Sequence, residues 1–243
     1  MSKKLRVSYT KLSFYSACPK RYYYRYVEKR PYYPTVMTKY GSNIHRSLKD
    51  FSEIIRSGQT IDKEVQETLY EKQWTSVSKD DSKNLELKNL GLKQLQDFVD
   101  SNINVMCNTI YLEKSFSFPF EDIVLCGYID RVDKLDNDKV EIIDYKTGNI
   151  RNLPQDDLQL NFYALVCRDY FNLTPAKLSL YFLKTNQKTS VDADNKCIDL
   201  IRNLIITTAD KILYENFIPT GESLLYSKDC CYQRICPESK QSR

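Results

Sequence analysis

The sequence predicts an α/β fold with a central mixed β-sheet, helices on both sides of it, a helical insert and a cysteine-bearing C-terminal tail. The first observation is a hairpin pattern over residues 123–148, where two β-rich runs flank the polar turn 135–138. The second is that segments with helical spacing of apolar residues precede and follow this hairpin. The third is a further strand-like run, residues 177–185, which follows one of those helices. Strands that alternate with helices are typical of α/β proteins.

The N-terminal part is predicted to be helical. Residues 8–29 have helical spacing and are divided at Cys18-Pro19, because proline is tolerated in a first helical turn but not in a helix interior. A second helix is expected to begin within Gly41–His45 and to run through Ile55. Its apolar stripe follows His45, which places this sole histidine near the N-terminal end of that face.

Residues 48–106 are predicted to form an all-helical insert, since 62–78 and 83–106 have helical period and composition. The expected core residues of the second segment are Leu87, Leu90, Leu95, Phe98 and Val99. Beyond the insert, residues 111–118 alternate as in a strand that presents Glu113.

After the hairpin, Pro154 is expected to open a helix through Tyr170, and residues 195–216 a long helix. The whole chain, 1–243, is long enough for one substantial core and is predicted to be a single domain.

Composition narrows the class of protein. Hydrophobic residues make up 42% and charged residues 28%, as in ordinary globular proteins. No run of about 18 apolar residues occurs, and the basic N-terminus has no apolar region behind it, so neither a membrane span nor a secretory signal is expected. We therefore expect an intracellular, cytoplasmic protein; its frequent Lys, Asn, Ile and Tyr suit an AT-rich genome such as that of a phage or virus.

The net charge of +4 does not by itself indicate nucleic-acid binding, but the basic residues cluster. Residues 18–30 interleave cations, including Lys20 and Arg21, with tyrosines 22–24 and 26. Cations for phosphates beside rings for bases are what a single-strand groove needs. The alternative is a basic amphipathic helix whose tyrosines pack in the core.

The hairpin carries the residues with the clearest chemistry. In a strand, residues i and i+2 point to one face, so Asp144 and Lys146 project together, and Asp130 on the paired strand can lie close to Asp144. Two carboxylates beside an ammonium suit a Mg²⁺ site. The alternative is a solvated charged surface, but the apolar run 140–143 leads directly into these residues and favours a site.

The eight cysteines form two groups, and an intracellular chain of this size needs no disulfide framework. Four stand singly and are expected to be small buried hydrophobes: Cys107, Cys126, Cys167 and Cys197. Cys230, Cys231 and Cys236 form a cluster before Pro237, which suggests metal or iron–sulfur ligation.

With these elements in place, the chain resembles the RecB-like branch of the PD-(D/E)XK nuclease superfamily, which includes recombination nucleases, CRISPR-adaptation nucleases and phage exonucleases. The resemblance spans nearly the whole chain and implies a restriction-endonuclease-like core. It is carried by five motifs in order: Leu12-Ser13-x-Tyr15-x-x-Cys18-Pro19-x-x-Tyr22-x-Tyr24, Gly41-x-x-x-His45, Gly127-Tyr128-Ile129-Asp130-Arg131, Asp144-Tyr145-Lys146-Thr147 and Gln159-x-x-x-Tyr163.

The resemblance implies a role for each residue of these motifs. His45, Asp130 and Asp144, with the backbone carbonyl of Tyr145, would bind Mg²⁺ or Mn²⁺. Lys146 would position or deprotonate the attacking water and stabilise developing charge, and it can assist the reaction if a desolvated site lowers its pKa. Glu113 is expected to contribute only from outside the ligand set. Gln159 and Tyr163 would hold the DNA strand or orient the site. Arg131 is also expected to contact DNA, as are Lys20 and Arg21 of the basic segment 18–30.

Many relatives hold a 4Fe-4S cluster with one N-terminal cysteine and a C-terminal Cys-x-x-Cys-x5-Cys group. Cys18, Cys230 and Cys236 match three positions, but Ser227 stands at the fourth and Cys231 is extra. A cluster using Cys231, a cluster with a non-cysteine ligand, a zinc ion and a vestigial site all stay open. The resemblance favours a structural iron–sulfur module built from residues 1–30 and 217–243.

We therefore expect a metal-dependent DNA exonuclease that acts on single strands or DNA ends, in recombination, replication, repair or CRISPR-type fragment processing. The chain has no Gly-x-x-x-x-Gly-Lys-[Ser/Thr] P-loop, so unwinding would need a partner, such as a helicase or a recombination or CRISPR-adaptation protein. Two alternatives stay open: a non-catalytic DNA-binding or assembly subunit with an unused nuclease site, and an unrelated fold in which the motif matches are accidental.

Overall fold

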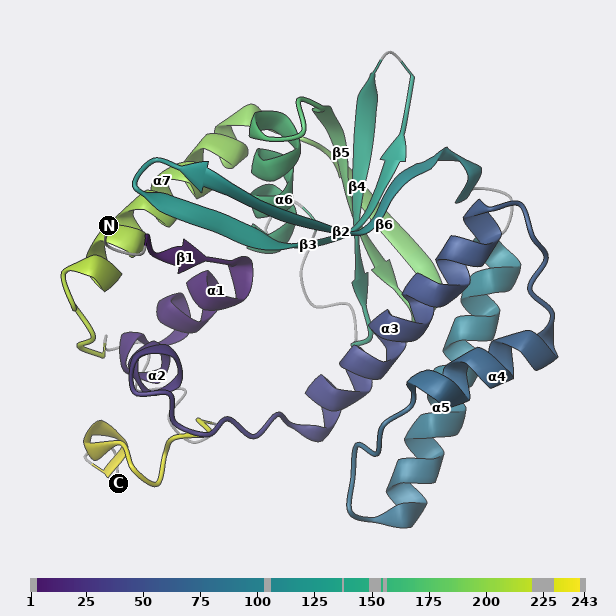
Figure 1. Cartoon of the computed structure of the whole chain (residues 1–243), viewed down its shortest axis with the longest axis horizontal. Helices are drawn as coiled ribbons and strands as arrows, with labels where there is room; N and C mark the ends of the chain where they lie inside the picture. The colour runs from purple at the N-terminus through teal and green to yellow at the C-terminus, as the bar shows by residue number, and fades with distance from the viewer. Residues whose placement is uncertain are drawn as a thin grey trace. The chain divides into compact units, whose positions relative to one another are not determined.

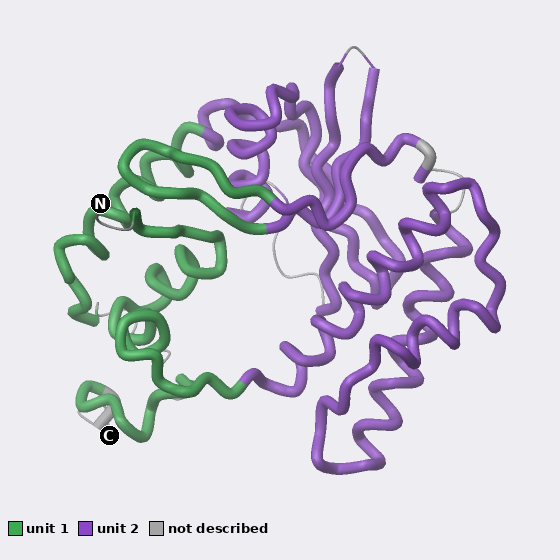
Figure 2. The backbone as a smooth tube through the Cα atoms, viewed as in Figure 1, with its two compact units in different colours: residues 1–33, 116–127, 199–243 green, residues 34–115, 128–198 purple. Residues whose placement is uncertain are grey.

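The computed structural model describes residues 4–102, 106–136, 138–148, 154, 157–219 and 230–240 (Figure 1). The chain divides into two compact units (Figure 2). Unit 1 comprises residues 1–33, 116–127 and 199–243, and unit 2 comprises residues 34–115 and 128–198. Three elements run through both units: β2 (Thr109–Phe120), β3 (Ile123–Lys134) and α7 (Asn195–Leu213).

The predicted α/β fold with a mixed sheet is confirmed. The hairpin is β3 paired antiparallel with β4 (Lys139–Lys146), and Asn137 of its turn lies outside the described residues. β4 pairs in parallel with β5 (Thr174–Phe182), which pairs antiparallel with β6 (Gln187–Asp192). β3 also pairs with β2 and, in parallel, with β1 (Arg6–Val7). The sequence patterns did not predict β1 or β6.

The parallel pair β4–β5 requires a crossover connection, and α6 (Leu158–Asp169) provides it. The helix begins later than Pro154, because Asp157 is its cap: one carboxylate oxygen accepts hydrogen bonds from the backbone N–H groups of Gln159 (2.9 Å) and Leu160 (3.0 Å). The start of α6 therefore meets the C-terminal end of β4.

A helical layer in unit 2 contains α3 (Val36–Arg56), α4 (Lys63–Gln73) and α5 (Asp81–Asn102). Its core includes side chains from the sheet, among them Ile143, Tyr145 and Tyr181. Successive strand residues face opposite sides, so this layer covers the odd-numbered face of β4, and α6 packs against β4 and β5. No helix in the described ranges is both long and apolar enough to cross a membrane.

Helix α3 begins well before Gly41, because the Thr35 hydroxyl caps it by accepting from the Thr38 N–H at 3.2 Å. His45 consequently lies in the middle of a long helix, not near its start. Gly41, one turn before His45, permits a close approach: a Cβ there would lie 3.3 Å from the Thr147 hydroxyl oxygen just after β4. The face of α3 that carries His45 is thereby held against the end of β4.

In unit 1 the break predicted at Cys18-Pro19 separates α1 (Tyr9–Ala17) from α2 (Pro19–Tyr22), and a π-helical turn (Tyr23–Val27) follows. Tyr22 and Tyr24 are buried, and Tyr22 packs with Tyr15 and Ile212 in a small core. These tyrosines serve packing, as the amphipathic-helix alternative predicted.

Glu141 in β4 is a buried acid that the neighbouring strands satisfy. It accepts a hydrogen bond from the Ser179 hydroxyl and lies 2.9 Å from the Lys188 Nζ. Burial raises its pKa, but these partners outweigh burial and the pKa is lowered overall. A lowered folded-state pKa means that the carboxylate stabilises the fold above its unfolded pKa and loses this effect as pH falls through the folded value.

Glu141→Gln is therefore expected to reduce the free energy of unfolding by about 1–3 kcal/mol at neutral pH, because charge-assisted hydrogen bonds are lost. The difference should shrink below pH 4.5, the ordinary value for this group, as the wild-type carboxylate takes up a proton. Urea denaturation at both pH values measures it, with the exposed Glu86→Gln as the control. A pH-independent difference would contradict the assignment.

Candidate functional site

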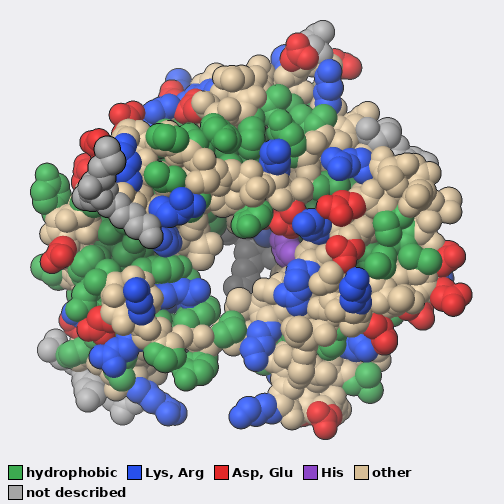
Figure 3. All heavy atoms as spheres, viewed as in Figure 1, with side chains coloured by type: hydrophobic (Ala, Val, Ile, Leu, Met, Phe, Trp, Pro, Cys, Tyr) green, Lys and Arg blue, Asp and Glu red, His purple; other side chains and the backbone are tan. Residues whose placement is uncertain are grey.

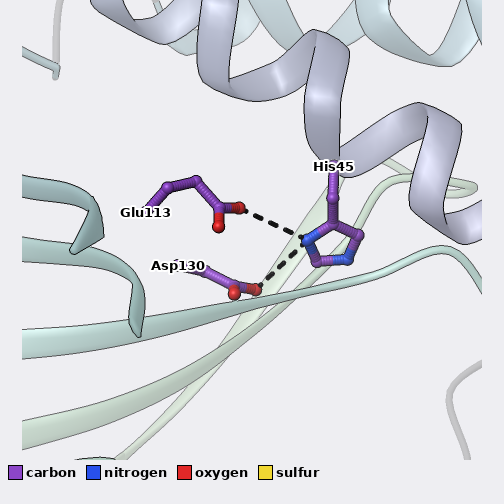
Figure 4. A group of neighbouring side chains, drawn as sticks. All are labelled: His45, Glu113 and Asp130. Atoms are coloured by element: carbon purple, nitrogen blue, oxygen red, sulfur yellow. Dashed lines mark ion pairs between the residues drawn. The ribbon is translucent and has the colours of Figure 1, made fainter. Parts of the chain in front are cut away.

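Three side chains from three elements of unit 2 converge: His45 from α3, Glu113 from β2 and Asp130 from β3 (Figure 4). The His45 Nδ1 lies 3.7 Å from a Glu113 carboxylate oxygen and 3.6 Å from an Asp130 carboxylate oxygen. One donor atom from each lies within 4.8 Å of the others. The His45 side chain is 32% exposed and is visible among acidic, basic and hydrophobic side chains in Figure 3.

The backbone explains why Glu113 belongs to this group. Its φ of 43° is in the left-handed region, which is rare for a residue inside a strand. Such local irregularities redirect a side chain and occur often beside active sites. The alternation of residues 111–118 predicted a strand that presents Glu113, and the resemblance placed this residue outside the ligand set.

Burial and neighbouring charges shift the pKa values of His45 and Asp130. Burial lowers the pKa of His45, but the carboxylates of Asp130, Glu113 and Asp144 outweigh this and raise it to about 9. Burial raises the pKa of Asp130, and the nearby Glu113 adds to the rise. Two crowded carboxylates with an imidazole suit a divalent cation, because the cation would offset the negative charge and imidazole and carboxylate are both metal ligands.

Lys146 organises the second part of the site. Its Nζ lies 2.6 Å from the buried Asp144 carboxylate and 3.3 Å from Asp157, and it donates to the Gln159 side-chain oxygen at 3.2 Å. Asp144 and Lys146 thus project from β4 together, as strand geometry predicts. Among the described residues, the group of close donor atoms comprises His45, Glu113 and Asp130, while the Asp144 carboxylate pairs with Lys146; metal binding by Asp144 stays a prediction.

The charge state of Lys146 differs from the expectation. Burial lowers its pKa, but the carboxylates of Asp144 and Asp157 raise it by more, so the pKa is above its ordinary value. The condition stated for Lys146 as a base, a pKa lowered by desolvation, is not met in this arrangement, because two carboxylates lie beside the ammonium. Asp157 carried only one signal in the sequence, an acidic residue directly before an apolar helix.

Buried contacts fix the neighbouring residues. The Tyr145 N–H donates to the Asp130 carboxylate at 3.0 Å, which joins β4 to the converging group. The Gln159 side-chain amide donates to the Tyr163 hydroxyl at 2.8 Å, and Tyr163 is buried. Gln159 therefore links Lys146 to Tyr163, on one face of α6 as their spacing predicts.

Arg131, for which DNA contact is predicted, is buried and paired in this structure. This residue is only 2% exposed, and its guanidinium donates to both carboxylate oxygens of Asp133 at 2.7 and 2.6 Å. Another guanidinium nitrogen donates to the Tyr145 hydroxyl at 3.5 Å. A buried charge is stabilised by pairing of this kind, so these contacts give Arg131 a structural role in the sheet, and its contact with DNA stays a prediction.

Lys20 and Arg21 lie in unit 1, where their charges cover aromatic faces. The Lys20 Nζ lies 5.0 Å from the centre of the Tyr23 ring, and the Arg21 guanidinium lies 4.3 Å from that of Phe14. A cation that lies over one face of a ring leaves only the other face for stacking with a base. DNA contact by these two residues stays a prediction.

The cysteines expected to hold a cluster lie in unit 1 as well. Cys18, Cys230 and Cys236 are partly buried, Cys231 is exposed, and the Cys236 thiol donates to Glu238 at 3.0 Å. Within the described ranges, no three of these thiols lie within 4.8 Å of one another. Ser227 lies outside those ranges. An iron–sulfur module therefore stays an implication of the resemblance alone.

Comparison with known proteins identifies a family whose model matches most of the chain. The family model described as the PD-(D/E)XK nuclease superfamily matches residues 6–237. No curated protein sequence matches. Among solved structures, the chain is similar to the one entitled "Crystal structure of SSO0001", with 17% sequence identity and a TM-score of 0.46, over 98% of this chain and 89% of that chain.

Proposed function

The chain belongs to the PD-(D/E)XK nuclease superfamily, and from this premise we propose that it is a Mg²⁺- or Mn²⁺-dependent deoxyribonuclease that digests single-stranded DNA or DNA ends as an exonuclease. A family match over residues 6–237 leaves no room for the alternative of accidental motif matches in an unrelated fold. The observation that carries the proposal is the convergence of His45, Glu113 and Asp130 beside the Asp144–Lys146 pair.

We assign the metal to His45, Glu113 and Asp130, with Asp144 and the Tyr145 carbonyl as the further ligands that the family resemblance implies. The crowded carboxylates and the raised pKa of Asp130 support a site that is electrostatically incomplete without a cation. A divalent ion bound there supplies Lewis-acid polarisation of the phosphodiester and activation of water. The role of Asp130 is also to hold β4 in place through the Tyr145 N–H.

In this proposal Lys146 acts as a fixed cation. Its raised pKa supports an ammonium that orients water and stabilises negative charge as it develops on the phosphate, because preorganised charge is effective in a partly buried site. Asp157 and Gln159 hold the ammonium at the end of β4. Gln159 and Tyr163 are thus positioning residues, and their hydrogen bond limits the rotamers of Gln159.

End-labelled single- and double-stranded DNA, incubated with Mg²⁺, Mn²⁺ or EDTA, tests the function. We expect metal-dependent cleavage that shortens the DNA progressively from an end, and the label gives its polarity. Products cut at internal positions would show that the enzyme is an endonuclease and would contradict the proposed exonuclease activity. Binding without cleavage under either metal would instead favour a non-catalytic DNA-binding or assembly subunit.

The cellular process is part of the same proposal: recombination, replication, repair or CRISPR-type fragment processing. Such processes supply DNA ends that a nuclease of this kind trims. A partner helicase or recombination protein would provide unwinding, since the sequence contains no P-loop.

A further inference from the structure

Tyr128 lies on β3 two residues before Asp130, so strand geometry places both side chains on the same face, roughly 7 Å apart along the strand. The intervening Ile129 is fully buried on the opposite face. Tyr128 itself is 61% exposed, whereas Asp130 lies buried against His45 and Glu113. All four residues belong to unit 2. An exposed aromatic ring therefore adjoins the converging donors.

The ring faces of Tyr128 are available. Within the described ranges, neither an aromatic ring nor a Lys or Arg side chain stacks on it, and its hydroxyl has no hydrogen-bond partner. Tyr111 on β2 is different, because its ring packs on Phe171 (centroids 5.0 Å apart) and the Lys114 Nζ lies 5.0 Å from its centre. Tyr145 and Tyr163 are buried. Tyr128 is thus suited to stack on something from outside the protein.

We propose that Tyr128 is a substrate-positioning residue that stacks on an unpaired nucleobase next to the scissile phosphate. This inference rests on the proposed nuclease function and deepens it, because it names a single-stranded nucleotide as the substrate at the site. Every base has a π-face that can stack on an aromatic side chain, and such stacking is tolerant of sequence. Inside a duplex both faces of each base are covered by neighbouring pairs, whereas an unpaired strand can present a base to Tyr128.

The test pairs a protein variant with a substrate variant. Tyr128→Ala is expected to raise the KM for labelled oligothymidylate roughly 5- to 150-fold, the range for losing one base–aromatic stack, with kcat changed far less. Tyr128→Phe keeps the ring and should behave like the wild type. The substrate variants are oligothymidylates with one abasic position, which is moved along the strand. At one position the KM of the wild type should rise by the same factor as the Tyr128→Ala substitution causes. At that position the KM of Tyr128→Ala should not rise further.

The same pairs are measured by fluorescence anisotropy in EDTA, where cleavage cannot interfere. The matched control is Tyr170→Ala, an exposed tyrosine in unit 2 that follows α6, roughly 16 Å along the helix from Gln159. Equal affinities and KM values for wild type and Tyr128→Ala would overturn the inference, as would additive losses at every abasic position. Absence of cleavage by the wild type would overturn the nuclease proposal, while the binding cycle in EDTA would still decide on Tyr128.

Discussion

Replacing Asp130 with asparagine is expected to lower the rate of DNA cleavage by about a thousandfold or more while leaving the fold intact. Loss of a metal-holding charge removes transition-state stabilisation of several kcal/mol. Asparagine keeps a side-chain oxygen that can accept from the Tyr145 N–H, so the link to β4 survives. The wild-type carboxylate is costly to bury without a cation, as its raised pKa indicates, and the melting temperature of the metal-free variant should not fall.

Single-turnover cleavage and thermal melting with and without Mn²⁺ measure these effects. Because a ligand that binds only the folded state raises its stability, Mn²⁺ should raise the melting temperature of the wild type and have much less effect on Asp130→Asn. Asp100→Asn, at an exposed position on α5, controls for the chemical change alone. If Asp130→Asn cleaved DNA within tenfold of the wild-type rate, Asp130 would have no place in the metal site.

Lys146→Met is expected to have the second large effect. DNA cleavage should slow about 10²- to 10³-fold, the usual loss in rate when one preorganised donor to a developing negative charge is removed. Methionine occupies a similar volume but lacks the ammonium that lies between Asp144 and Asp157. Lys146→Arg separates the two roles that the resemblance implies, because arginine keeps the positive charge and cannot act as a base. With the lysine pKa raised, the charge is the expected contribution, and the arginine variant should retain activity within about tenfold of wild type.

Single-turnover rates at saturating metal measure this series, with Lys93→Met on α5, an exposed position, as the matched control. Mn²⁺-dependent melting shows whether each variant still binds metal. If the arginine and methionine variants were equally inactive although both bound Mn²⁺, the fixed-cation role would be wrong and proton transfer by Lys146 would take its place.

Sequence patterns predicted those parts of the site that depend on local geometry. The hairpin follows from apolar alternation and a polar turn, and the shared direction of Asp144 and Lys146 follows from the two-residue period of a strand. The spacing of Gln159 and Tyr163 likewise placed them on one helical face. Each of these relations involves residues close in the chain, where backbone geometry leaves few alternatives.

The remaining parts depend on tertiary contacts that no local pattern reports. Glu113 enters the group through an irregular backbone conformation in β2, and Asp157 reaches Lys146 only because α6 starts beside the end of β4. DNA contact by Arg131 was predicted because the sequence of a strand does not show whether a cationic side chain on it is buried. Both faces of β3 are covered at that point, and Asp133 supplies the partner that makes burial tolerable.

The crossover helix has a consequence for the order in which this protein becomes active. During synthesis from the N-terminus, the chain contains His45 and Glu113 before it contains Asp157 and Gln159, which hold Lys146, and the parallel β4–β5 pair joins segments on either side of α6. Pairings between distant segments are slow to form because chain entropy must be lost first. Under the proposed function, a partly folded chain without the docked α6 and β5 would lack the contacts that hold Lys146 and would not cleave DNA.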